Sequence, residues 1–313
     1  MTRRTGKHRG EAAEILTRRT VVAGIGAAVP LFAGAAWAQQ TPPGGGPPTT
    51  GGPPRGRPAG PPPTAAEKAA ALPLKSDGLE HFGMIVPDVS VAAKFYSKVF
   101  NPTGLHKEKQ GDLRYYVTLG ERGYIAMGTR AVYPPPFMDH FCATVLDYKP
   151  AAVSARLVDE KIPAGRVGIL PDPNGIGLQL LGAPGGLAGS IEPASRIVNG
   201  EALVKPRGLD SIFLQVTDFD KSLAYYRMFF GKEATLAADK ATWKIADTTL
   251  YIYKGSATEP ARFDYFGVRV EAFDQKALET ELRLLGATLV PDAGDGFMRF
   301  RDPYGLGCAL RKV

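Results

Sequence analysis

The stretch "LEHFGMIVPDVSVAAKFYSKVF", residues 79–100, decides the fold, because the chain carries it twice. A second version, "LDSIFLQVTDFDKSLAYYRMFF", begins 130 residues later at position 209 and aligns with the first over 22 positions without a gap. Each version is typical of a strand, a turn and a helix, and the pattern predicts an internal duplication. The two versions differ where the strand begins, since His81 in the first is Ser211 in the second.

Each half of the folded region itself contains two copies of one order of strands and helix. Val91, Phe95 and Val99 recur at the i, i+4 spacing of one helix face, which predicts a helix over 88–100 followed by short strands. This order recurs, so we expect four βαβββ units, residues 79–128, 139–182, 210–254 and 262–312. The sequence therefore predicts an α+β protein whose units pair into two cupped mixed sheets. The two domains are expected over 77–186 and 207–313, with a connector over 187–206.

The N-terminal segment has the composition of an export signal. Residues 1–20 carry six basic and two acidic residues, an uncharged apolar run follows, and Ala-Trp-Ala at 36–38 forms an A-x-A cleavage site. The adjacent pair Arg18 and Arg19 indicates the twin-arginine route. The alternative is a membrane anchor. Because the run is weakly apolar and the cleavage site follows at once, we interpret 1–38 as a cleaved signal peptide and expect a periplasmic or extracellular protein.

The remaining composition indicates which kinds of binding partner to expect. Residues 39–76 read as a linker rich in proline and glycine, which cannot bury a core. Without the signal the formal charge falls from +7 to +3, so the basic balance is not the mark of a nucleic-acid surface. We expect a small-molecule substrate or ligand, no nucleic acid and no stable membrane insertion after cleavage; a homodimer stays open. Cys142 and Cys308 fall in different halves, and we expect two separate buried thiols.

These motifs resemble the vicinal oxygen chelate superfamily. The resemblance rests on the opening Leu-x-His, the aromatic pair of the following helix and the closing turns "DPNGIG" and "DPYGLG", and it covers about 235 residues. The superfamily includes glyoxalase I, extradiol dioxygenases, and the bleomycin and fosfomycin resistance proteins. Since it contains lyases, isomerases, dioxygenases and plain binders, the resemblance predicts the fold and leaves the reaction open.

The resemblance also implies a metal site in the first half. The family takes ligands from histidines near the start of the first strand of paired units, here His81 and His140, and from a residue seven positions after the turn aspartate, here Gln179. Strand alternation sets each of the three opposite a strongly apolar row, so all three can face one cup. The family usually has a glutamate in the third place, so one negative charge is missing. The implied cofactor is a divalent transition metal, Fe(II), Mn(II), Zn(II) or Ni(II).

The second half lacks these ligands. Its equivalent positions are Ser211, Ala309 and, if the ambiguous register of "FDYFGVRV" is right, Asp264, so we expect packing, dimer contact or a pocket wall from it. In the four-unit dioxygenases of the family the metal usually lies in the C-terminal pair of units, and a site in the N-terminal pair departs from that pattern.

The leading hypothesis is an exported metal-dependent enzyme, a lyase, isomerase or dioxygenase acting on a small substrate with two neighbouring oxygens. The alternative is a non-catalytic small-molecule-binding protein, similar to bleomycin resistance proteins, with a degenerate metal site. A structural role is favoured if the cup is filled by its own aromatic side chains. No catalytic base is assigned. Tyr115, Tyr116 and Asp139 lie near the predicted cup, but tyrosines on strands are more often packing residues.

Overall fold

The computed structural model describes residues 61–100, 105–110, 112–120, 122–129, 135–163, 168–182, 190–192, 201–256 and 258–313. The predicted signal peptide (1–38), the linker up to residue 60 and residues 193–200 of the connector lie outside the described residues. Within the described part of the chain, no helix is long and apolar enough to cross a membrane.

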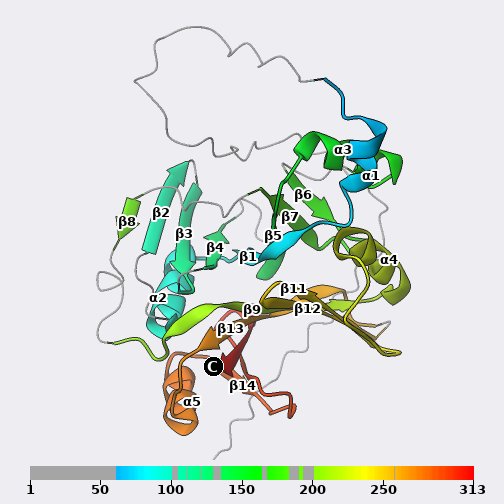
Figure 1. Ribbon diagram of the computed structural model, residues 1–313. Coiled ribbons are helices and arrows are strands. Elements are labelled where there is room, and N and C mark those ends of the chain that lie inside the picture. The colour runs from blue at the N-terminus through cyan, green and yellow to red at the C-terminus, as the bar shows by residue number, and fades with distance from the viewer. Residues whose placement is uncertain are drawn as a thin grey trace, which may run out of the picture. The chain divides into compact units, whose positions relative to one another are not determined.

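Two eight-stranded mixed sheets form the fold, one from each half of the sequence (Figure 1). The first has the order β6-β7-β5-β1-β4-β3-β2-β8. Its strands are β1 (Ser76–Ile85), β2 (Leu105–Gln110), β3 (Asp112–Thr118), β4 (Tyr124–Gly128), β5 (Phe137–Val145), β6 (Ile169–Pro171), β7 (Gly177–Leu181) and β8 (Ser190–Glu192).

The second sheet repeats this plan with the order β10-β11-β12-β9-β13-β16-β15-β14. Its strands are β9 (Pro206–Val216), β10 (Thr235–Leu236), β11 (Lys240–Ile245), β12 (Thr248–Lys254), β13 (Arg262–Val270), β14 (Thr288–Val290), β15 (Met298–Arg301) and β16 (Gly307–Lys312). In each sheet the first strands of two units pair antiparallel, β1 with β5 and β9 with β13. The predicted α+β class and the pairing of units are confirmed, and neither sheet closes into a barrel.

Five helices accompany the sheets, namely α1 (Ala65–Ala70), α2 (Val89–Phe100), α3 (Pro150–Asp159), α4 (Phe219–Phe230) and α5 (Gln275–Leu284). Helix α2 agrees with the helix expected over 88–100. Helix α1 lies inside the range expected to be linker. Its first turn has a capping box between Thr64 and Glu67, and Lys68 bonds Asp159 of α3 at 2.9 Å.

The faces of the two sheets that lie opposite the predicted cups share one hydrophobic core. Phe82 of β1 stacks on Phe266 of β13 with ring centroids 4.2 Å apart, and both rings are fully buried. Phe82 alternates with His81, so the apolar row of β1 contacts the second sheet while the histidine faces the other way. Burial of such rings is the main stabilising contribution of the interface between the halves.

Two matching hydrogen bonds also join the halves. Tyr96 of α2 donates from its hydroxyl to Asp302, in the last turn of the second half, at 2.8 Å. Tyr226 of α4 donates in the same way to Asp172, in the last turn of the first half, at 3.1 Å. Each aspartate also accepts two backbone N–H groups of its own Asp-Pro-x-Gly turn. The repeated Tyr and Asp-Pro-x-Gly motifs thus bond across the halves, each helix to the turn of the other half.

Candidate metal centre

Two β-bulges in the pairing of β1 with β5 set an acidic residue beside each predicted histidine ligand. The register shifts at Glu80, which precedes His81, and at Asp139, which precedes His140, so each acid is the extra residue of its bulge. A bulge re-aims side chains that regular alternation would send to opposite faces. Each carboxylate therefore reaches the imidazole that follows it in the chain.

The two acid–histidine pairs have the same geometry. Glu80 Oε2 lies 2.8 Å from His81 Nδ1, and Asp139 Oδ1 lies 2.8 Å from His140 Nδ1. A carboxylate only accepts, so Nδ1–H is the donor in both pairs. The side chains of the first pair are 6% exposed, and those of the second are 13% and 15% exposed. In both rings Nε2 is consequently the nitrogen left for a further interaction.

The structure brings the three predicted ligands together. The His81 and His140 rings meet edge to face with centroids 5.5 Å apart, and Gln179 Oε1 lies 3.0 Å from His81 Nε2. Gly83 makes the second histidine's position available, because a Cβ at Gly83 would come within 2.2 Å of His140 Cε1 and 2.4 Å of Asp139 Oδ1. Of the tyrosines considered as bases, Tyr115 is buried in the core.

The hydrogen-bond inventory of His81 leaves one atom unsatisfied. Burial lowers the pKa of the His81 imidazole, so the ring is neutral near pH 7 and has a single N–H. With that proton on Nδ1 toward Glu80, Nε2 presents a lone pair to an amide oxygen. Two arrangements resolve this contact: a rotated Gln179 amide whose NH₂ donates to Nε2, or a cation held by Nε2 and Oε1 together.

A separation of 3.0 Å is usual for the hydrogen bond of the first arrangement, and it also fits the second. Ligand atoms about 2.1 Å from one ion and at right angles lie about 3 Å apart, which is the spacing of Nε2 and Oε1. Neutral imidazole nitrogens and an amide oxygen are donors that divalent first-row metals accept. The residues present therefore fit a transition metal.

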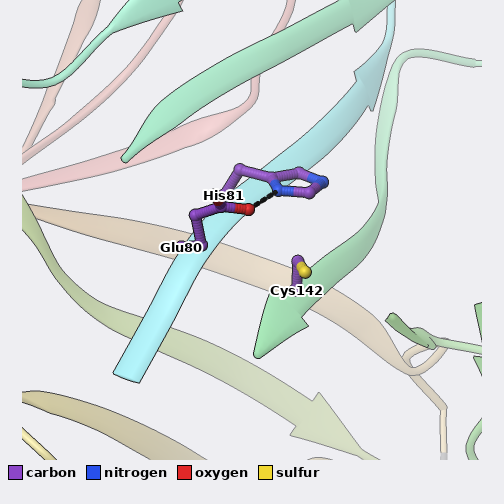
Figure 2. A group of neighbouring side chains, drawn as sticks. All are labelled: Glu80, His81 and Cys142. Atoms are coloured by element: carbon purple, nitrogen blue, oxygen red, sulfur yellow. Dashed lines mark hydrogen bonds and ion pairs between the residues drawn. The ribbon is translucent and has the colours of Figure 1, made fainter. Parts of the chain in front are cut away.

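A second potential ligand set shares the same histidine (Figure 2). Among the described residues, ligand atoms of Glu80, His81 and Cys142 all lie within 4.8 Å of one another. Cys142 is fully buried on β5 directly opposite His81, and burial, reinforced by Glu80, raises the pKa of its thiol well above the usual range. Glu80 contacts Nδ1 of His81, whereas the predicted trio uses Nε2. We therefore assign Glu80 and Cys142 to the surroundings of the trio.

Tyr124 was not singled out from the sequence. Its ring lies 4.5 Å from that of His81 and within 12° of parallel, because Tyr124 faces His81 across the parallel pair β1 and β4. Tyr116 of β3 packs edge to face on Tyr124. Glu80 was likewise missed, because strict alternation assigns it to the face opposite His81. The signal that was available is the acid before each histidine, Glu-His and Asp-His.

The register of the second sheet corrects one sequence assignment. Phe213 faces Tyr265 in the way that Gly83 faces His140, so Tyr265 and not Asp264 occupies the second histidine's place. Asp264 is instead the bulge residue that corresponds to Asp139. The alternation in "FDYFGVRV" left this register open by one residue.

The other equivalences hold as expected. Ser211 faces Gly267 as His81 faces Cys142, and Ala309 pairs with Gly267 as Gln179 pairs with Cys142. The second sheet thus has a serine, a tyrosine and an alanine where the first has its candidate ligands.

The cup of the second sheet is filled by its own side chains. Phe213, Tyr265, Phe297 and Ala309 form a buried cluster. The Phe213 ring stacks on Tyr251 at 4.6 Å, and the Arg299 guanidinium lies between 5.2 and 5.7 Å from three ring centroids of this group. Cation–π contacts of this kind stabilise a closed packing arrangement.

The first sheet has small residues where the second has rings. The register sets Gly83, Ala126 and Gly128 at the positions that Phe213, Tyr251 and Tyr253 occupy in the second half. Beside His81 the first sheet has the Tyr124 ring, and the space at Gly83 is occupied by the His140 ring. The second half meets the condition stated for a structural role, a cup filled by its own aromatic side chains.

Comparison with known proteins supports the fold. No family model and no curated protein matches the chain. Among solved structures it is similar to the 2,3-dioxygenase LapB from Pseudomonas sp. KL28, with 14% identity and a TM-score of 0.55 over 77% of this chain and 93% of that one. It is also similar to homoprotocatechuate 2,3-dioxygenase from Arthrobacter globiformis, with 15% identity and a TM-score of 0.51 over 77% and 81%.

A variant of 4-hydroxymandelate synthase from Streptomyces coelicolor has 11% identity and a TM-score of 0.53, over 75% of this chain and 92% of that one. At such identities the likeness concerns the fold. The chain shares the two-sheet α+β fold of these solved structures, which agrees with the predicted α+β class and paired units.

Proposed function

We propose that this protein is an exported, metal-dependent enzyme of the vicinal oxygen chelate superfamily. In this proposal His81, His140 and Gln179 hold the metal in the N-terminal sheet. The observation that carries it is the contact of His81 Nε2 with Gln179 Oε1 at 3.0 Å, where a neutral imidazole leaves two acceptors facing each other. The fold shared with 2,3-dioxygenases supports it. Export rests on the composition of residues 1–38, which lie outside the described residues.

The chain's own residues have distinct roles in this site. Glu80 and Asp139 hold the two imidazoles by Nδ1, so that each Nε2 remains a donor for the metal. Tyr124 covers one face of the His81 ring. A divalent metal such as Fe(II), Mn(II), Zn(II) or Ni(II) would supply Lewis acidity to a substrate that binds it through two neighbouring oxygens.

The positions of Ala126 and Gly128, which are small where the second sheet has Tyr251 and Tyr253, supply the space that such a substrate needs, whereas Gly83 leaves room for the His140 ring. The second sheet uses these positions for rings and has no candidate ligands. We therefore assign substrate binding to the first half and propose a lyase, isomerase or dioxygenase reaction there. A binding protein without catalysis, the alternative, would use the same space without a metal.

Metal content per chain tests the proposal. The mature protein, expressed with export intact, is compared by elemental analysis with the double variant His81→Ala/His140→Ala and with Tyr265→Phe, which alters the equivalent position of the second half. We expect about one equivalent of a single transition metal in the parent protein and in Tyr265→Phe, and none in the double variant.

Turnover is then screened with catechols and α-oxo compounds. A protein that holds no metal, even after incubation with Fe(II), Mn(II), Zn(II) and Ni(II), would contradict the metal site and leave a small-molecule binder. Metal that persists in the double variant would show that other residues hold it.

A further inference from the structure

Glu80 and Asp139 occupy positions that recur four times in the chain, once in each unit. Each sheet has three register shifts between the first strands of its two units, and at two of them the extra residue is an acid in both halves: Asp210 and Asp264 stand in the second half where Glu80 and Asp139 stand in the first. What differs is the group that each carboxylate contacts. The two halves therefore show which partners compensate the charge of these carboxylates.

In the second half the acids are neutralised by arginines. Arg311 pairs with Asp210, which is fully buried. Arg301 and Arg262 pair with Asp264 at 2.7 and 2.9 Å. A buried carboxylate requires such a partner, because desolvation of an uncompensated charge is costly.

In the first half Glu80 and Asp139 each contact the imidazole of the histidine that follows. Glu80 is 6% exposed and bonds His81, and no lysine or arginine pairs with it among the residues that the structure describes. The candidate ligands His81, His140 and Gln179 carry no negative charge of their own when the imidazoles are neutral. A divalent cation at His81 Nε2 would thus be balanced by the Glu80 carboxylate, which contacts the other nitrogen of the same ring.

We propose that Glu80 and Asp139 are the positioning residues of the metal site and that Glu80 supplies the negative charge that Gln179 lacks. The inference rests on the proposed function. The metal then compensates Glu80 through the His81 imidazole, as Arg311 compensates Asp210 in the second half. Each carboxylate fixes the Nδ1–H tautomer of its histidine and thereby keeps Nε2 free for the metal.

The test measures metal affinity in the full-length mature protein by chelator competition with Zn(II) and Co(II). The variants are Glu80→Gln and Asp139→Asn, and the matched control is Asp264→Asn, at the equivalent bulge of the second half. We expect each of the first two to weaken binding about 10–100-fold. We expect the control to stay within about twofold, because its carboxylate is held by arginines away from the candidate ligands.

Two further readouts separate positioning from a structural role. Removing an uncompensated buried carboxylate should leave metal-free Glu80→Gln melting no lower than the metal-free parent, while the rise in melting temperature on adding Zn(II) shrinks. The Co(II) absorption spectrum of the variant should also change, because the ring is no longer fixed at Nδ1. Glu80→Gln/Gln179→Glu returns one negative charge and should recover part of the lost affinity.

The outcomes are distinct. Parent protein that binds neither Zn(II) nor Co(II) refutes the proposed function itself. Parent protein that binds them, with Glu80→Gln and Asp139→Asn unchanged within twofold, overturns the positioning role and leaves the ligand set standing. An equal loss in Asp264→Asn would attribute the effect to general destabilisation and overturn it as well.

Discussion

Replacing Tyr96 by phenylalanine removes one of the two matching bonds between the halves. The ring is fully buried, and the variant keeps its volume, so no cavity forms. What is lost is the hydroxyl that donates to Asp302 at 2.8 Å. Hydrogen bonds to charged groups contribute about 1.5–3 kcal/mol, and we expect Tyr96→Phe to lower the free energy of unfolding by about this amount at pH 7.

The loss of stability caused by Tyr96→Phe should depend on pH. Burial raises the pKa of the Asp302 carboxyl, against which the Tyr96 hydroxyl acts to lower it. The folded pKa of Asp302 therefore lies above its unfolded pKa, and between these two values the native state binds more protons than the unfolded state. The contribution of Asp302 to the free energy of unfolding consequently rises as pH falls through the folded pKa. Without the hydroxyl the folded pKa rises further. The loss caused by Tyr96→Phe should therefore be smaller near pH 4 than at pH 7.

Urea unfolding at pH 4 and pH 7 measures the loss of stability. The slope of the unfolding free energy against urea concentration should be the same in the variant and the parent protein. Tyr226→Phe, which removes the equivalent bond to Asp172, should behave alike, and the two losses should add because the bonds share no partner. The matched control is Tyr304→Phe, whose half-exposed hydroxyl contacts a backbone carbonyl at 3.3 Å and should change stability by less than about 0.5 kcal/mol. A loss under about 0.5 kcal/mol for Tyr96→Phe at pH 7 would refute the reasoning.

Three further changes test the two cups. Gly83→Ala brings a Cβ within 2.2 Å of His140 Cε1 and should weaken metal binding about tenfold or more, as measured by chelator competition. The control Gly128→Ala, whose added Cβ would have its nearest atom 4.0 Å away, should leave metal binding unchanged. Equal effects would contradict the assignment of His140 as a ligand. Phe297→Ala opens the filled cup, since the ring is 4% exposed, and should cost about 3–5 kcal/mol in urea unfolding; a cost below about 1 kcal/mol would show a loose cup. Ala126→Tyr copies the second half's ring and should abolish small-molecule binding or turnover with metal content unchanged, and loss of the metal as well would argue against a separate substrate space.

The sequence alone determined the duplication and the α+β class, and the family resemblance of its motifs implied the trio His81, His140 and Gln179 as neighbours. These are local properties. A gapless repeat over 22 positions is visible by alignment, and strand alternation orients each side chain relative to its own neighbours. The trio could be carried over residue by residue because each member lies at a counted distance from a motif.

Only the tertiary structure decided which residues surround the trio. A bulge adds one residue to a strand and reverses the alternation that follows, so neither Glu80 beside His81 nor Tyr265 in place of Asp264 could be read from a period of two. The bond from Tyr96 to Asp302 joins residues 206 positions apart, and the stack of Tyr124 on His81 depends on strand pairing. Such contacts depend on register and on packing between sheets, which local pattern does not encode.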